Sequence, residues 1–339
     1  MFHHLLRYKE LSKMKSESFL NRLEIGVPEI SQEIFGGNSS VFKGRLPKGT
    51  ELAIKKYRGD QLRIERMLSR EQRAITFLRE NGLKNIPEIL EVRGDLGLIV
   101  YRWIEGSAPL ADHDSMSAII NMCGSLHEIH KHGLSFDNAI DAAFSLSEIN
   151  FQVMTRVQQF EDTYSSVDIK ILCERIRNQL YLCTTGKSLD TNFTQQTFSV
   201  SDLGTHNIIN SGGNFNFIDF EFFGLDSINK LVGDFLLHPR NEFSKFESSR
   251  FIEDISQISQ WDRSELVEVL PLLTLKWAVI AFGRTFRESV LAATGSITEL
   301  HIAESKGSKY LDYFDMLGLA DGKDSFRTFG SFVGKIAKP

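Results

Sequence analysis

The chain has 339 residues, of which 42% are hydrophobic and 24% charged, and its formal net charge at pH 7 is −5. This length predicts about two domains or lobes, and the acidic balance argues against a nucleic-acid-binding surface, which would be basic. Three cysteines, none of them in a C-x-x-C pair, exclude a disulfide framework and a structural zinc site as the basis of the fold.

The sequence predicts no membrane-spanning helix and no membrane partner. Its longest apolar run, around residues 275–282, contains Lys276 and falls short of the roughly 20 apolar residues that a spanning helix needs. Residues 1–19 lack the long apolar stretch of a signal peptide. We therefore expect a cytoplasmic protein with free thiols.

The pattern along the chain divides it into three parts. Residues 1–29 predict an N-terminal helical extension, residues 30–104 a lobe of strands with one helix, and residues 105–339 a mostly helical lobe. In chain order the expected strands are at 33–37, 40–45, 51–57, 89–93, 97–103, 196–200 and 208–218, the last of these as a hairpin, and the first helix is at 69–81. This layout predicts an α+β fold with two lobes, as in protein-kinase-like enzymes.

Lys55 and Glu71 form the first candidate pair. Lys55 ends the strand motif Leu52-Ala-Ile-Lys, which resembles the V-A-I-K strand of kinases. The expected helix opens with a capping-box pattern at Ser69 and Gln72, and its apolar positions place Glu71 on the inward face, where a carboxylate needs a cationic partner. The alternatives are that Lys55 is a solvated edge charge and that Glu71 only favours the helix N-terminus through the dipole.

The second candidate is a loop followed by a hairpin. Asp202 and Asn207 stand in the spacing D-L-x-x-x-N of a kinase catalytic loop. A turn at residues 210–214 would pair Asn207 with Ile218 and bring Asp219 beside Asn207. Oxygen ligands of this kind suit Mg²⁺ held together with substrate phosphates. The alternative is that each aspartate is a turn or cap residue.

Two further segments are considered. The turn that contains Gly36, Gly37, Ser39 and Ser40 can lay backbone N–H groups against phosphates, although an ordinary hairpin explains it equally well. In the helical segment near residue 277, the pattern favours a solvated face for Lys276 over a position at a cleft.

These residues resemble the aminoglycoside phosphotransferase and choline kinase family, whose signature is H-G-D-x-x-x-x-N followed by I-D-x-E. The matching stretches are Ser201-Asp202 to Asn207 and Ile218-Asp219-Phe220-Glu221, and the resemblance covers about residues 30–240. The chain departs from the pattern where Val200-Ser201 replaces the usual H-G.

The resemblance implies a two-lobed protein-kinase-like fold that transfers the γ-phosphate of ATP to a hydroxyl of a small molecule, such as a sugar or an amino alcohol. It implies that Asp202 orients and deprotonates the acceptor hydroxyl, and that Asn207 and Asp219 hold Mg²⁺, with Glu221 as a further metal candidate. It also implies that ATP is bound by Lys55, which Glu71 holds, by the glycine-rich turn and by a hinge at Trp103 and Ile104.

One alternative of a different class remains, a non-catalytic kinase-like module that binds a nucleotide or regulates another protein. The presence of Lys55, Asp202, Asn207 and Asp219 favours the enzyme. A protein kinase is disfavoured because Asp219-Phe-Glu replaces D-F-G and no A-P-E follows. The sequence leaves the phosphate acceptor open, as well as the choice between ATP and GTP.

Overall fold

The computed structural model describes residues 20–35, 39–164 and 167–291. These residues fall into two compact units. The first takes the chain up to Ala108 and includes the later segment Asn207–Phe223, while the second takes Pro109–His206 and the chain from Gly224 onwards.

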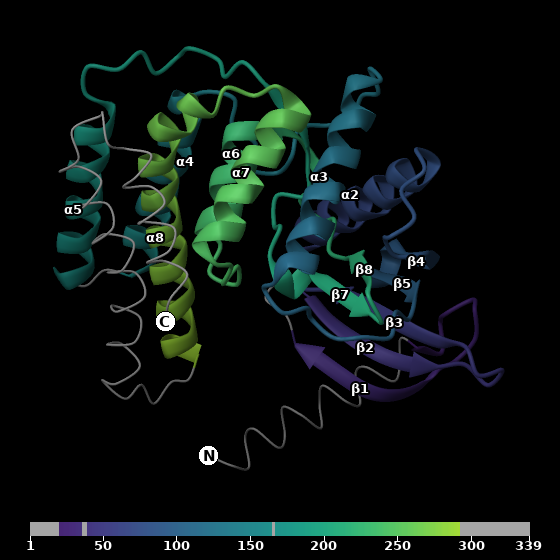
Figure 1. Cartoon of the computed structure of the whole chain (residues 1–339). Helices are drawn as coiled ribbons and strands as arrows, with labels where there is room; N and C mark the ends of the chain where they lie inside the picture. Colours follow the sequence, from purple (N-terminus) through teal and green to yellow (C-terminus); the bar gives the residue numbers. More distant parts are fainter. Residues whose placement is uncertain (1–19, 36–38, 165–166, 292–339) are drawn as a thin grey trace. The chain divides into compact units, whose positions relative to one another are not determined.

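The first unit is built on a five-stranded antiparallel sheet in the order β1-β2-β3-β5-β4 (Figure 1). Its strands are β1 (Glu29–Phe35), β2 (Ser39–Arg45), β3 (Glu51–Tyr57), β4 (Ile89–Arg93) and β5 (Leu98–Arg102), and the short 3₁₀ helix η1 (Gly94–Leu96) joins β4 to β5. Alternation sends Leu52 and Ile54 of β3 to one face, where they form a core with Leu98 and Val100 of β5. The other four expected strands of this part of the chain are confirmed, whereas the first begins at Glu29, four residues earlier than predicted, and its expected end at residues 36–37 lies outside the described residues.

Residues before the sheet also contribute to this core. Leu20 and Leu23 are buried against the same apolar cluster, and Glu91 of β4 accepts hydrogen bonds from the backbone N–H groups of Glu24 and Ile25. Residues 21–28 form turns and irregular backbone and Glu29 begins β1, so the expected N-terminal helical extension was wrong for this stretch. The part of that extension before residue 20 lies outside the described residues.

The helix α2 (Gln61–Glu80) begins eight residues earlier than the sequence pattern predicts. Asp60 caps it by accepting a hydrogen bond from the backbone N–H of Arg63, at 2.9 Å. Ser69 therefore lies inside the helix, and the capping-box interpretation was wrong. The buried face begins at Met67 and Leu68, upstream of the apolar positions on which the prediction rested.

The hairpin of β7 (Ile208–Ser211) and β8 (Asn214–Phe217) belongs to the first unit. Its register pairs Ile208 with Phe217 and Asn210 with Phe215, as predicted. The turn is Gly212-Gly213, both with positive φ, which a two-residue hairpin of type I′ requires. The backbone of Asn210 exchanges two hydrogen bonds with Ser107, and these join the hairpin to the end of the first chain segment.

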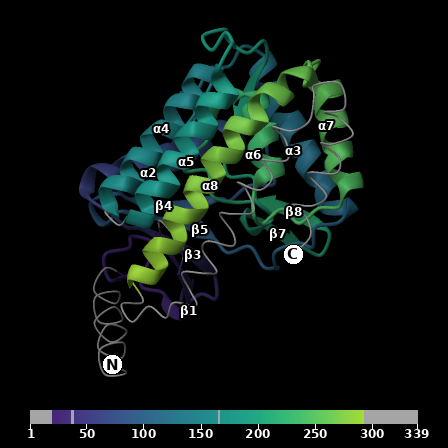
Figure 2. The same ribbon diagram turned by 90° about the vertical axis from the view of Figure 1, so that its left-hand side faces the viewer.

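The second unit is mostly helical. Its helices are α3 (His113–Lys131), α4 (Leu146–Thr163), α5 (Val167–Thr184), α6 (Ile228–Leu237), α7 (Lys245–Ser259) and α8 (Leu266–Leu291). It also contains the 3₁₀ helix η3 (Arg263–Glu265) and an antiparallel pair of strands, β6 (Gln196–Ser199) and β9 (Gly224–Ser227). The 3₁₀ helix η2 (Thr205–Asn207) ends at Asn207, where the chain returns to the first unit. The helices α4, α5 and α8 lie side by side (Figure 2). This unit is mostly helical, as the predicted fold class requires of one lobe. The segment Asn207–Phe223, which the sequence analysis assigned to the helical lobe, instead belongs to the first unit.

One stretch, formed by η3 and most of α8, is long and apolar enough to cross a membrane, contrary to the sequence expectation. Within the described residues, Arg263–Gly283 has 21 residues and a mean hydropathy of 1.8, and 61% of its most apolar part is buried inside the protein. A single helix of this kind is weak support for a membrane span, because the core helix of a folded domain gives the same pattern.

Candidate active site

Lys55 lies on a central strand and points to one face of the sheet. Its strand β3 is paired on both sides, with β2 and β5. Since Leu52 and Ile54 fill the core on one face, alternation directs Lys55 to the other. The residue is 5% exposed, so the alternative interpretation of Lys55 as a solvated edge charge was wrong.

Four charged side chains meet at this point, and we call them the Lys55 cluster: Lys55, Glu71, Asp219 and Glu221. The ammonium nitrogen Nζ of Lys55 lies 2.7 Å from Oε2 of Glu71, 2.7 Å from Oδ1 of Asp219 and 3.0 Å from Oε2 of Glu221. The predicted ion pair between Lys55 and Glu71 is thereby confirmed. Glu71 lies in the middle of α2, not in its first turn, so the helix-dipole interpretation was wrong.

Glu71 is held by further donors. The hydroxyl of Tyr57 donates to its Oε2, and the backbone N–H of Phe220 donates to Oε1 at 3.4 Å. Its side chain is 1% exposed. Glu71 therefore joins a strand, a helix and the segment that follows β8.

The cluster carries one positive charge for three carboxylates. Burial alone would lower the pKa of Lys55, but Asp219, Glu71 and Glu221 together raise it well above its usual value, so the ammonium stays charged. Burial raises the pKa of Glu71, although Lys55 opposes the shift. The excess of negative charge fits a second cation, such as a divalent metal ion.

The segment after β8 aims the carboxylate of Asp219 at this cluster. Asp219 has φ of +69°, a left-handed conformation that aspartate tolerates better than most residues. Arg70 of α2 donates to the carbonyl of Phe223 at 2.9 Å and so ties the far end of the segment to the helix.

Asn207 lies next to this segment in the same unit. The backbone N–H of Ile218 donates to the carbonyl of Asn207 at 2.9 Å, which continues the hairpin register by one pair, as predicted. Asn207 is 7% exposed. Carboxylate and amide oxygens are hard donors of the type that Mg²⁺ takes, so the residues present fit the expected metal.

The remaining residues predicted to bind the nucleotide belong to the turn before β2 and to the hinge after β5. Ser39 and Ser40 are buried at the start of β2, and an N–H of Arg58 donates to the hydroxyl of Ser40. Gly36 and Gly37 lie outside the described residues. The backbone N–H of Trp103 donates to the carbonyl of Glu51 at 3.1 Å, so a nucleotide base at this hinge would use the Trp103 carbonyl or the backbone of Ile104.

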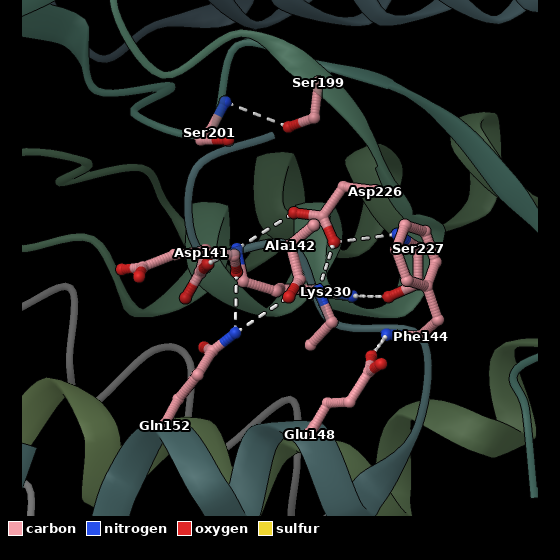
Figure 3. A network of polar contacts seen from close by, with 12 residues as sticks. Asp141, Ala142, Phe144, Glu148, Gln152, Ser199, Ser201, Asp226, Ser227 and Lys230 are labelled. Carbon is pink, nitrogen blue, oxygen red and sulfur yellow. Dashed lines mark hydrogen bonds and ion pairs between the residues drawn. The ribbon is translucent and has the colours of Figure 1, made fainter. Parts of the chain in front are cut away.

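In the second unit, Asp202 lies in a tight loop after β6. The backbone N–H of Ser201 donates to the hydroxyl of Ser199 at 3.0 Å (Figure 3), and Ser201 has φ of +64°. The backbone N–H of Asp202 donates to the carbonyl of Val200 at 2.8 Å. The loop therefore leaves the Asp202 side chain partly open to solvent, with 35% of it exposed.

Two histidines beside Asp202 were missed by the sequence analysis. Nε2 of His238 lies 3.0 Å from Oδ1 of Asp202, and Nε2 of His206 lies 3.8 Å from Oδ2. The two imidazole rings are stacked, with centroids 5.2 Å apart. His206 lies inside the D-L-x-x-x-N motif and was within reach of sequence reasoning, whereas His238 follows α6 and has no local signal.

The chain was compared with known proteins by sequence and by structure. No protein-family model matches the chain, and no curated protein matches its sequence. Solved structures do match, at low identity. A choline kinase from Cryptosporidium parvum has a TM-score of 0.59 at 12% identity, over 90% of this chain and 93% of that chain.

Two further matches are another choline kinase and an antibiotic phosphotransferase. The choline kinase LicA from Streptococcus pneumoniae has a TM-score of 0.54 at 14% identity, over 97% of this chain and 99% of that chain. A spectinomycin phosphotransferase solved with ADP and spectinomycin has a TM-score of 0.52 at 12% identity, over 96% and 97%. The chain therefore shares the fold of these choline kinases and of this spectinomycin phosphotransferase, and the protein-kinase-like fold that the sequence motifs predict is confirmed.

Proposed function

We propose that this protein is a small-molecule kinase that transfers the γ-phosphate of ATP to a hydroxyl group. The observation that carries the proposal is the Lys55 cluster, a buried lysine held by a helix carboxylate beside an aspartate in a left-handed turn. The similar structures are kinases of choline and phosphotransferases of antibiotics, which supports phosphate transfer to a small molecule.

The proposed roles follow from the chemistry of phosphoryl transfer, in which the protein supplies position and charge neutralisation. Lys55 binds the α- and β-phosphates of ATP and is held in place by Glu71. Asp219 and Asn207 would hold Mg²⁺, which neutralises charge on the phosphates when bound. Glu221 supports Lys55 through its ion pair and is a second candidate for the metal.

Asp202 acts on the acceptor. Its carboxylate accepts a hydrogen bond from the acceptor hydroxyl and orients the oxygen for attack. A carboxylate is a weak base, so the proton moves to it late, as the bond to the leaving phosphate loosens. We further propose that the protein works in the cytoplasm on a free small molecule, without a nucleic-acid or membrane partner.

A screen of ATP consumption against a library of sugars, amino alcohols and other hydroxyl compounds tests the function. We expect at least one compound to raise turnover above the rate with water alone, and Asp202→Asn to abolish this stimulation. The matched control is Asp190→Asn, the same change at an exposed aspartate. If no compound stimulates turnover while ATP still binds, the non-catalytic nucleotide-binding module becomes the better description.

A further inference from the structure

We propose that His238 is a positioning residue for Asp202 and acts by donating a hydrogen bond from Nε2 to Oδ1 of the carboxylate. The distance between these atoms is 3.0 Å. The inference rests on the proposed function, in which Asp202 receives the acceptor hydroxyl. In this inference, His238 sets the direction of the Asp202 carboxylate.

The hydrogen bond at the other ring nitrogen identifies the tautomer of His238. The backbone N–H of Arg240 donates to Nδ1 at 3.1 Å, so Nδ1 carries a lone pair. A neutral imidazole has one proton, which must then reside on Nε2 and point at Asp202. The same proton argues against a metal ion held by Asp202, His206 and His238, because Nε2 would need its own lone pair to be a ligand.

The surroundings of His238 fix the plane of its ring. The side chain is 8% exposed. His206 stacks on one face, and the edge of the ring meets Trp277 with centroids 5.2 Å apart and an angle of 81°. Gly204 permits this packing, since a Cβ there would lie 2.4 Å from His206 and 2.6 Å from His238.

The loop of Asp202 is held by other bonds as well. Asn241 accepts from the backbone N–H of Thr205 and donates to the carbonyl of Leu203, both at 3.0 Å. The hydroxyl of Thr205 donates to the carbonyl of Arg240 at 2.7 Å. These bonds do not involve the imidazole, so a variant at His238 keeps the loop in place and changes mainly the support of the carboxylate.

Fixing one oxygen of a carboxylate fixes its plane and thus the direction of the other oxygen. If Oδ1 is held by His238, the direction of Oδ2, which lies 3.8 Å from Nε2 of His206, is also defined, and we assign Oδ2 to the acceptor hydroxyl. Misplacement of a reacting group by about 1 Å can lower a rate about 100-fold. The role of His238 is therefore expected to be visible in turnover and not in nucleotide binding.

The hydrogen bond itself is tested by nuclear magnetic resonance on protein labelled with ¹⁵N at histidine. We expect one imidazole in the Nε2–H tautomer, with a proton protected from exchange with water, whose signal is absent in His238→Gln. In Asp202→Ala that protection should be lost. A proton on Nδ1 of His238, or the same protection in Asp202→Ala, would overturn the proposal whatever the enzyme's substrate is.

The consequence for catalysis is tested by phosphate release from ATP and Mg²⁺, with water as the acceptor or with a compound found in the screen. We expect His238→Leu to lower kcat about 10- to 100-fold with an unchanged KM for ATP. His238→Gln, which can still donate an N–H, should recover most of the loss. The control Arg240→Gln should have no effect, because Arg240 is exposed and it is its backbone that bonds to Thr205 and to His238.

A double-mutant cycle separates this inference from the proposed function. In the Asp202→Asn background, His238→Leu should cause no further loss, because the residue acts through Asp202. An equal loss in both backgrounds would refute the positioning role and leave the function intact. Wild-type turnover in Asp202→Asn would instead refute the function, and the resonance measurement would still decide whether the hydrogen bond exists.

Discussion

At the scale of single residues, Asp219 has an unfavourable backbone conformation, and its carboxylate lies close to two other carboxylates that share the same lysine. Its φ of +69° costs about 1 kcal/mol or more for most side chains, and aspartate is among the residues that tolerate it best. Its carboxylate lies 2.7 Å from a lysine that two other carboxylates already neutralise. Such a residue contributes little net stability, which is consistent with a role in holding a ligand.

The first prediction at this scale concerns Asp219→Asn. Asparagine keeps the size of the side chain and the left-handed backbone, and removes only the charge. We expect the affinity for ATP in the presence of Mg²⁺ to fall about 10-fold or more, and the affinity without Mg²⁺ to change little. Calorimetry with and without the metal measures both, with Asp190→Asn as the control. Equal ATP binding by the unmodified protein in the two conditions would remove the metal assignment.

At the scale of elements, a buried charge network joins β9, α6 and α8. Asp226 accepts hydrogen bonds from the backbone N–H groups of Ala143 and Ser227 and pairs with Lys230 at 3.0 Å (Figure 3). Lys230 reaches Asp234 at 2.9 Å, one turn further along α6. Asp234 in turn lies 3.5 Å from Lys276 of α8, so a chain of alternating charges crosses from one helix to the next.

Lys276 is the member of this network that the sequence misplaced. It is 3% exposed, because α8 is covered by α4, α5 and α6 and has no solvated face at this position. Burial lowers its pKa to about 8, Asp234 opposes the shift, and Lys230 adds to it. Asp234 has its own partners in Lys230 and the indole N–H of Trp277, and its pKa is lowered to about 2.

The prediction at this scale concerns pH and stability. Since the pKa of Lys276 is about 8 in the fold and about 10.4 in an unfolded chain, the folded state binds fewer protons between these values. The contribution of Lys276 to the free energy of unfolding therefore rises from about pH 8 to about pH 10.4. Below that window the buried ammonium costs stability, on the order of 3 kcal/mol at most.

The variant Lys276→Met should be more stable than the unmodified protein at pH 7, by about 1 to 3 kcal/mol, because Asp234 keeps its bond to Lys230. The advantage should shrink by pH 10. Urea unfolding at both pH values measures the difference, and Lys48→Met, at an exposed lysine, controls for the loss of net charge. A variant that is less stable at pH 7 would show that Lys276 is needed to neutralise Asp234.

At the scale of the whole molecule, the features that the sequence predicted depend on local periodicity. The register of the β7–β8 hairpin follows from alternation and a Gly-Gly turn, and the inward position of Glu71 follows from helical periodicity. The start of α2 was missed because a local capping pattern at Ser69 competed with the true cap at Asp60. The contact between His238 and Asp202 joins residues 36 positions apart, and only the fold brings them together.

The division of residues between the two units leads to the last prediction. Lys55, Glu71, Asn207 and Asp219 all belong to the first unit, whereas Asp202 belongs to the second. If the first unit binds ATP, a change at Asp202 should leave that binding intact. We expect Asp202→Asn to keep the ATP-dependent rise in melting temperature and to lower turnover about 100-fold or more, as when a positioned base is lost.

Asparagine retains one oxygen and the shape of the side chain, so the loop and its bond to His238 are preserved while the charge is lost. Thermal melts with ATP and Mg²⁺, and turnover with the same preparation, give the two readouts together. A structural role for Asp202 predicts the opposite pattern, in which the protein melts at a lower temperature and the folded fraction turns over normally. A stable variant with unchanged turnover would contradict both roles, since a residue that positions the acceptor cannot lose its charge without affecting the rate.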